Sequence, residues 1–413
     1  MPLPTNSNLL TTSKITKETL YQLSNNMVLA NKCDWSYSEQ FANAAQQIGD
    51  RLSIRRPILV DVREDSMTWT ANLPYEAVST LVVDKSFGVD LKFQDTDRTL
   101  KIENFAERFI KAPIVTFANK IDAYVYGKVL NSVSNSVGQY SASITTDTIL
   151  EATEKLRAFN CPDDGEIYGV LTPKQQRSLA NYQMTLFNAQ KQIADIYLKG
   201  RIGEFAGVEW AWSNSSPTHV DGTWAGTPTV SGASSTALLT SGWAETATLS
   251  VDGFTAGATL AVGDVFSISG TYAYNPLTKS VLPYLQQFVV TTAVASSTSA
   301  AQAVVVSPAL IVSGPYKNVD VSVSGTTPLI KYSTSGTQGQ EGLVFHKKAI
   351  AVASPMLFKP PMSVKAESIK DPDTNVNIRF IEGFDPTGAY TISRVDAILG
   401  VKVLRPEHVV RIR

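Results

Sequence analysis

Two short runs of this sequence place carboxylates at spacings that could support chemistry. In the first, Asp95, Asp97 and Thr99 alternate directly after an apolar strand. A carboxylate pair in this order can attack a phosphate ester and then act as general acid and base, with magnesium screening both charges. Such a site also needs a downstream lysine and an acidic pair on a parallel sheet, and the parallel βαβ repeat is missing. Asp and Thr at this point serve equally well as caps of a following helix, which is the interpretation we favour.

The second run, Asp371 to Glu382, has the oxygen-ligand spacing of a calcium loop. Its sixth position, where the sharp turn requires glycine, is Val376. Gly383 and Pro386 then break the helix that should follow. A polar turn leading into a strand at 377–381 explains the pattern better. The three histidines, His219, His346 and His408, have no Cys or His neighbour at ligand spacing, so we expect no metal site.

Charge and cysteine content narrow the class of protein. The formal net charge is −1, and no run of five or six like charges occurs, which argues against tight nucleic-acid binding. Cys33 and Cys161 are too few for a disulfide framework and fit a reducing compartment. The first residues lack the features of a secretory signal, and no window holds about 18 consecutive apolar residues. We expect a protein that is made in a cytoplasm and is soluble there.

The elements that must position these residues fall into a mixed α/β frame around a distinct middle segment. Between Ala211 and Gln340 only eight residues are charged, whereas the other 283 residues carry 65 charges. Short apolar runs at 247–251, 265–268, 288–290 and 303–306, and alternating valines at 319, 321 and 323, predict strands separated by Gly and Pro. The segment is predicted to be a small all-β sandwich or barrel; a low-complexity linker is the alternative.

Before this segment, two alternating runs predict one long hairpin, with arms at 51–62 and 87–93. Because Pro57 has no backbone N–H to donate, the first arm is predicted to be an edge or bulged strand. Twelve-residue arms would reach roughly 40 Å, too far for a compact domain, so the hairpin should lie on a partner. A long helix is predicted from Leu100 to Val133, kinked at Pro113.

Further elements are predicted on both sides of the middle segment. We expect helices at 146–159 and 173–188, strands at 167–171 and 342–353, and terminal strands at 401–406 and 409–413.

Several of these runs resemble the coat proteins of tailed double-stranded DNA bacteriophages, in the podovirus branch. The similar segments follow the family's order over essentially the whole chain and are the arm at Leu10–Leu20, the hairpin start IGDRLSIR at 48–55, the helix run ANKID at 118–122, Gly200–Phe205, Leu343–Ile350 and the pattern from Arg394 to Val401 followed by Arg405–Glu407. The match is thinner in the middle segment, where it includes Gly263–Asp264, Ser269–Gly270 and Lys279–Leu282.

The resemblance implies an α+β protein with the Hong-Kong-97-type capsid fold and an inserted all-β domain. It divides the chain into an N-terminal arm (1–47), an extended-loop β-hairpin (48–93), a peripheral domain with a spine helix (94–145), an axial domain (146–212), the inserted domain (213–341), an axial return strand (342–362) and the C-terminal part of the peripheral domain (363–413).

The function implied is that of a major capsid protein, without catalytic, cofactor or metal sites. Its expected partners are copies of itself in pentamers and hexamers, a scaffolding protein, and a portal protein at one vertex, with neither sequence-specific nucleic-acid binding nor a membrane. It would be made in the host cytoplasm and reside in the virion. At the hairpin tip, Arg63, Glu64, Asp65 and Trp69 are the expected contacts with a neighbouring subunit.

Two alternatives belong to other classes. A β-rich surface-layer or adhesin-type protein fits the Ser/Thr-rich middle segment, but it should carry an export signal and tandem repeats. A phosphatase of the haloacid-dehalogenase type rests on the Asp95–Thr99 run alone.

Overall fold

The computed structural model describes most of the chain. The described residues are 19, 23, 27–39, 50–60, 75–94, 111–184, 203–231, 238–239, 242–296, 301–321, 323, 325–359, 365–370, 376–388 and 390–413. They group into two units, one of residues 1–52, 80–125 and 351–402, the other of residues 53–79, 126–350 and 403–413. Each unit is described by itself. None of the described helices is long and apolar enough to cross a bilayer.

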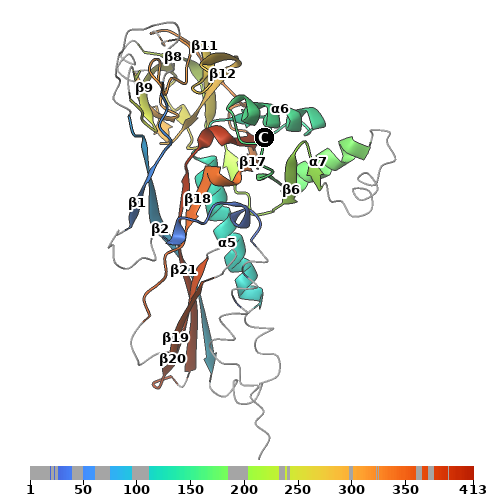
Figure 1. Cartoon of the computed structure of the whole chain (residues 1–413), viewed down its shortest axis with the longest axis vertical. Helices are drawn as coiled ribbons and strands as arrows, with labels where there is room; N and C mark the ends of the chain where they lie inside the picture. The colour runs from blue at the N-terminus through green and yellow to red at the C-terminus, as the bar shows by residue number, and fades with distance from the viewer. Residues whose placement is uncertain are drawn as a thin grey trace, which may run out of the picture. The chain divides into compact units, whose positions relative to one another are not determined.

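The first unit is built on long antiparallel strands. The sheet order is β1 (Arg51–Arg55), β2 (Val78–Gln94), β21 (Tyr390–Val403), β20 (Asn377–Asp385) and β19 (Lys365–Lys370), and β18 (Ile350–Ala353) also pairs with β21. Figure 1 shows β19, β20, β21 and the end of β2 side by side. Gly88 faces Asp396 across the β2–β21 ladder, where a Cβ atom would lie 2.8 Å from the Asp396 carboxylate. This carboxylate binds the side chains of Arg379 and Arg394.

The helix α5 (Lys111–Leu130) contributes residues up to Val125 to this unit. Its apolar stripe is buried as predicted, and Phe87 of β2 packs edge-on against Phe117. On the same helix, the Asp122 carboxylate accepts the backbone N–H groups of Val28 (2.8 Å) and Ala30 (3.0 Å). Asp122, the last residue of the ANKID run, therefore holds an N-terminal segment against the helix.

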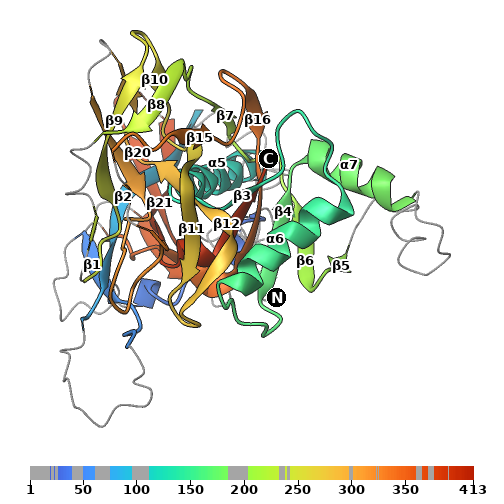
Figure 2. The same ribbon diagram turned by 90° about the horizontal axis from the view of Figure 1, so that it is seen from above.

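The second unit contains a mixed sheet covered by two helices. Its strands, in spatial order, are β3 (Ser136–Val137), β22 (Val409–Ile412), β17 (Gly342–His346), β4 (Ile167–Leu171), β6 (Val208–Trp212) and β5 (Glu204–Phe205). The helices α6 (Thr146–Ala158) and α7 (Pro173–Met184) share one apolar core with this sheet, and Figure 2 shows α6 beside β4 and β6. Gly169 leaves room for Trp210, because a Cβ atom there would lie 2.4 Å from the indole ring.

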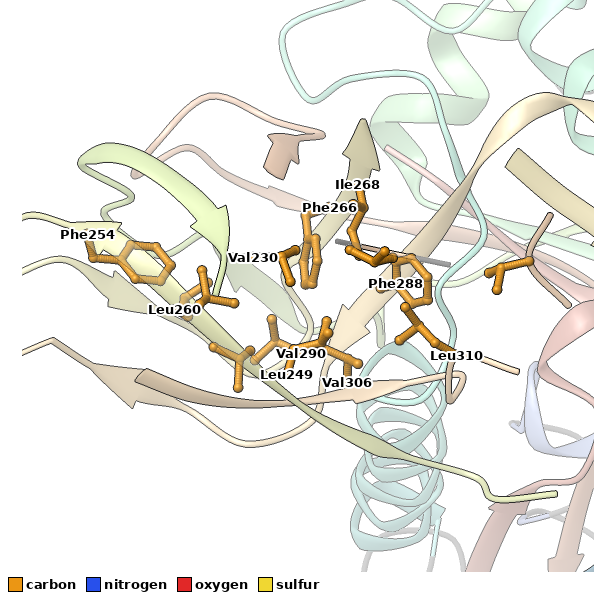
Figure 3. Close-up of a cluster of buried hydrophobic side chains, with 14 of the residues drawn as sticks. Val230, Leu249, Phe254, Leu260, Phe266, Ile268, Phe288, Val290, Val306 and Leu310 are labelled. Carbon is orange, nitrogen blue, oxygen red and sulfur yellow. The ribbon is translucent and has the colours of Figure 1, made fainter. Parts of the chain in front are cut away.

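The middle segment forms a sheet of its own within this unit. Its strands, in spatial order, are β15 (Leu329–Lys331), β11 (Val265–Asn275), β12 (Ser280–Val290), β14 (Gln302–Ser307), β9 (Ala247–Phe254) and β8 (Gly226–Val230), and β10 (Thr259–Leu260) pairs separately with β13 (Val294–Ala295). Figure 3 shows side chains of these strands converging on one core that includes Phe266 and Phe288. The ring centroids of these two residues are 5.9 Å apart. We call this segment the insert.

Most predicted elements are present, and four differ. The predicted terminal strand at 401–406 is only the end of β21, which stops at Val403 before a 3-10 turn at Pro406–His408. The 87–93 run does not pair with the 51–62 arm: β2 faces β1 only near its start, where Arg56 N–H donates to Ala77, and from Val83 onward it pairs with β21. Val319 makes only a single bridge to Ala273, so the alternating valines form no regular strand in the described residues. The predicted 342–353 strand is interrupted by a 3-10 turn at Lys347–Ala349.

Two further outcomes concern the ends of the elements. The edge position of β1, which stops before Pro57, is as predicted. The last strand, β22, lies in the sheet with β17 and β4, so residues 403–413 group with the second unit and not with 365–402. The parts of the predicted helices at 100–110 and 185–188 and the Asp95–Thr99 run lie outside the described residues.

Candidate functional site

The insert joins the rest of the second unit through a two-stranded neck. Its entering strand β7 (Thr218–Val220) pairs antiparallel with its leaving strand β16 (Gln338–Gln340), so that Gln338 faces Val220 and Gln340 faces Thr218. The neck is immediately followed by Glu341 and by β17 of the mixed sheet. Entry and exit of the insert are therefore adjacent.

A cluster of charged side chains surrounds this neck, most of them buried. We call it the neck cluster; its members are His219, Asp221, Asp264, Lys331, Glu341, Arg411 and Arg413. Three carboxylates thus face two arginines and one lysine, and one histidine lies among them. The cations on the C-terminal strand and the acids on the insert and its neck come from segments far apart in sequence.

Glu341 forms ion pairs with both arginines of the neck cluster. Its carboxylate lies 3.3 Å from the Arg411 guanidinium and 3.0 Å from that of Arg413. The Tyr140 hydroxyl also donates to it in a short hydrogen bond. Arg411 additionally donates to the Leu130 carbonyl at the end of α5 (3.0 Å) and to the Gly263 carbonyl in the insert (2.8 Å). One side chain thereby links the last strand, the helix end and the insert.

His219 joins the two remaining acids. Its Nε2 atom lies 3.2 Å from an Asp221 oxygen and 3.1 Å from an Asp264 oxygen. Asp264 also accepts the backbone N–H groups of Ala261 (2.8 Å) and Gly222 (3.1 Å). Asp221 in turn lies 3.5 Å from Arg413. The acids thus connect the neck, the turn that precedes β11 and the C-terminal strand.

Burial and charge act against each other in this cluster. Burial alone would lower the pKa of His219, but its hydrogen bonds with Asp221 and Asp264 raise that pKa above its usual value. Burial would raise the pKa of Glu341, yet Arg411 and Arg413 hold it below the usual range. The pKa of Asp221 is likewise lowered by His219 and Arg413, against the effect of burial. Each ionised group is thus stabilised by its partners.

His219, Asp221 and Asp264 are residue types that can bind a metal ion. The charges around them favour a protonated His219 over a bound metal ion. A divalent cation would add two charges beside Arg413, in a cluster whose acids already have cationic partners. The hydrogen bonds of a second group of this kind exclude it as a metal site; its members are Asp164, Glu166 and His346. His346 Nδ1 accepts the Lys348 N–H, which assigns the ring proton to the Nε2 that faces Asp164. We therefore assign both groups a structural role.

The predicted tip residues, Arg63, Glu64, Asp65 and Trp69, lie outside the described residues. Of the calcium-like run, residues 371–375 also lie outside them; Val376 is buried, and the Asn377 amide is bonded to Ser354. The structure brings His219 together with carboxylates, whereas sequence spacing left it isolated. His346 and His408, far apart in sequence, have their rings 6.4 Å apart.

The neck cluster was missed from sequence, although one signal for it was available. Residues 211–340 include only eight charged residues, and three of them, Asp221, Asp264 and Lys331, belong to the cluster. In a segment so depleted in charge, an ionised residue that remains tends to have a specific partner. The arginines that complete the cluster lie about eighty residues beyond the insert's last charge, so sequence spacing does not identify them.

Comparison with known proteins gives one match over almost the whole sequence. A family model described as "P22 coat protein - gene protein 5" matches residues 5–411. No match was found among curated proteins.

Solved structures with similar folds also exist. One from Mycobacterium phage Che8 has 13% identity and a TM-score of 0.47, covering 94% of this chain and 91% of that chain. The capsid structure of cyanophage P-SCSP1u has 12% identity and a TM-score of 0.42, covering 88% of this chain and 83% of that chain. A virus-like particle from Pyrococcus furiosus has 7% identity and a TM-score of 0.40, covering 97% of this chain and 98% of that chain.

Proposed function

As a member of the P22 coat protein family, this chain is a bacteriophage capsid protein with a structural role, and we propose that it closes into an icosahedral shell of pentamers and hexamers with the help of a scaffolding protein. The observation that carries the proposal is the family match over residues 5–411, which includes the insert as well as the frame around it. The shell would enclose the phage genome and carry a portal protein at one vertex. Synthesis would take place in the host cytoplasm.

We propose the Hong-Kong-97-type fold for the assembled subunit, with parts assigned as follows. The long strands β2 and β19–β21 with the first part of α5 would be the peripheral domain, and the sheet around β17 and β4 with α6 and α7 the axial domain. Because β22 is part of that sheet, residues 403–413 belong to the axial domain in this assignment. The hairpin that begins at β1 would be the extended loop.

The charge of the protein supports a container rather than a nucleic-acid-binding protein. A net charge of −1 gives no general attraction to phosphate, so the shell could enclose a genome without holding it. Family membership gives no support to the surface-layer or adhesin alternative, or to the phosphatase. The neck cluster joins segments of the second unit that are far apart in sequence.

Co-expression with a scaffolding protein, followed by sedimentation and negative-stain microscopy, tests the proposal. We expect closed particles of megadalton mass, and curved or irregular aggregates when the scaffolding protein is left out. A protein that stays monomeric at every concentration, with the scaffolding protein present, would contradict it.

A further inference from the structure

One tyrosine hydroxyl of the insert forms hydrogen bonds with the base of the hairpin. We define the hairpin base as residues 56–60 and 75–79, all of which belong to the second unit. The Tyr316 hydroxyl lies 3.0 Å from the Tyr75 carbonyl and 3.4 Å from the Pro57 carbonyl, and it accepts the Leu59 N–H at 3.4 Å. Both arms of the hairpin are therefore bound by the same atom of the insert.

Aromatic and charged contacts surround this hydroxyl. The rings of Tyr75 and Tyr316 pack edge to face with centroids 6.3 Å apart. The Tyr75 hydroxyl donates to the Trp243 carbonyl, and the Arg56 guanidinium lies 5.1 Å from the centroid of the Trp243 ring. Arg56 also forms a 2.8 Å ion pair with Glu407. Two separate stretches of the insert, at Trp243 and at Tyr316, thus contact the hairpin base.

A mostly apolar cavity of about 250 Å³ adjoins these contacts. It is lined by Leu59 of the hairpin base, by Trp243 and Ile311 of the insert, and by Leu404 near the C-terminus. Side chains that border a cavity make fewer dispersion contacts than side chains in a filled core. The orientation of the hairpin base consequently depends on a few directed contacts, and Tyr316 makes most of the hydrogen bonds among them.

We propose that Tyr316 is a positioning residue for assembly. It sets the direction of the hairpin base relative to the insert. The hydroxyl bridges the two arms, while the ring, only 7% exposed, is packed with Ala77 and Ile311 in a small core separate from that of the insert sheet. The insert would thereby be coupled to whatever contact the hairpin makes with a neighbouring subunit. This last step rests on the proposed function; the positioning itself does not.

The test uses the full-length monomer with Tyr316→Phe, which keeps the ring and removes the hydroxyl. Amide hydrogen exchange should accelerate about tenfold at Leu59 and neighbouring residues of the hairpin base, because a hydrogen bond has been lost there. Exchange at Val304 and Leu249, which pair inside the insert sheet, should not change and serves as the check on folding. The matched control is Tyr272→Phe, since Tyr272 lies in the same sheet and is 42% exposed.

Spin labels distinguish positioning from a general loss of stability. Labels at Val60 and Val281, both exposed, report the separation of the hairpin base and the insert. The distance distribution should broaden in Tyr316→Phe and stay narrow in Tyr272→Phe. Unchanged exchange together with an unchanged distribution would overturn the positioning role.

Assembly with a scaffolding protein then tests the coupling. A fall in the yield of closed particles for Tyr316→Phe, but not for Tyr272→Phe, is the expected result. Normal assembly despite a displaced hairpin base would overturn the coupling. If the unaltered protein itself fails to form particles, the proposed function fails, and the monomer measurements still decide the role of Tyr316.

Discussion

At the scale of single residues, the neck cluster shows what buried charges require. Arg411 and Glu341 are fully buried, and neither would be tolerated there without the other. A buried ion pair adds little to stability compared with an apolar pair, but the loss of one partner leaves an uncompensated charge. The cluster therefore specifies how the insert is attached more than it strengthens the fold.

Replacing Glu341 by Gln should lower the free energy of unfolding by about 3–5 kcal/mol, because two buried guanidinium groups lose their shared carboxylate. Urea unfolding of the monomer measures the change. The matched control is Glu166→Gln, whose ion pairs with Lys347 and Lys348 are exposed and should be worth about 0–1 kcal/mol. Equal losses in the two variants would show that Glu341 is solvated and that the cluster is open.

Stability should also depend on pH through His219. Its pKa is raised in the folded protein, so its contribution is fully present below the unfolded value of about 6.5 and is lost as the pH rises through the folded pKa. The facing charges are Asp221, Asp264, Glu341 and Arg411. Thermal unfolding at pH 6 and at about pH 8.5 should show a loss of stability on the alkaline side that His219→Gln diminishes.

His408 provides the opposite control for this pH dependence. Burial lowers its pKa, so the neutral form is favoured and stability is lost as the pH falls below the unfolded value. His408→Gln should therefore increase the alkaline loss that His219→Gln diminishes. Two variants with the same effect on the pH profile would contradict the assignment.

At the scale of elements, periodicity predicted the strands and helices but not their partners. The strand β4 and the helix α6 match their predicted bounds within a residue, because alternation and the three-four spacing are local properties. The partner of β2 is about three hundred residues away along the chain, and nothing in the alternation of Phe87 to Phe93 indicates it. Gly88 and Gly400, which allow β2 and β21 to approach, acquire meaning only once the pairing is known.

The insert should fold when residues 213–341 are expressed alone. Its buried core, from Val230 to Val323, is drawn entirely from within this segment, and its ends meet in the neck. We expect a β-type circular dichroism spectrum and a cooperative melt, with faster hydrogen exchange at β7 and β16 because Arg411 and Arg413 are absent. A random-coil spectrum would instead indicate a linker that depends on the rest of the chain for its structure.

At the scale of the whole molecule, a shell repeats each contact between subunits many times. A loss of about 1–2 kcal/mol at one contact, too small to unfold a subunit, is multiplied over the assembly. The family was evident from sequence, since it rests on the order of motifs along the chain, whereas the reach of the hairpin stays a prediction. The neck cluster was not, because it depends on side chains that only the folded chain brings together.

Replacing Glu64 and Asp65 by Lys at the predicted hairpin tip should abolish assembly and leave the monomer intact. Charged residues at such a contact set register and exclude wrong partners, so reversal of two charges should reduce the yield of particles sharply. Monomer melting and particle yield are measured together, with Lys348→Glu, on an exposed residue outside the hairpin, as the control. Normal assembly, or a monomer that unfolds, would contradict the assignment of the tip to a subunit contact.

The paired strands of the neck also bear on how such a domain can be gained or lost in evolution. Because β7 and β16 run side by side, a short turn could replace everything beyond them without moving the rest of the chain. Such a deletion would also remove Asp221 and the Gly263 carbonyl, partners of the guanidinium groups of Arg413 and Arg411. The backbone geometry of the neck would therefore allow the insert to be lost. The guanidinium groups, however, would lose partners that they need in a buried position. A descendant that discards the domain should first, or at the same time, exchange both arginines and Glu341 for uncharged residues, because Glu341 is the buried ion-pair partner of both.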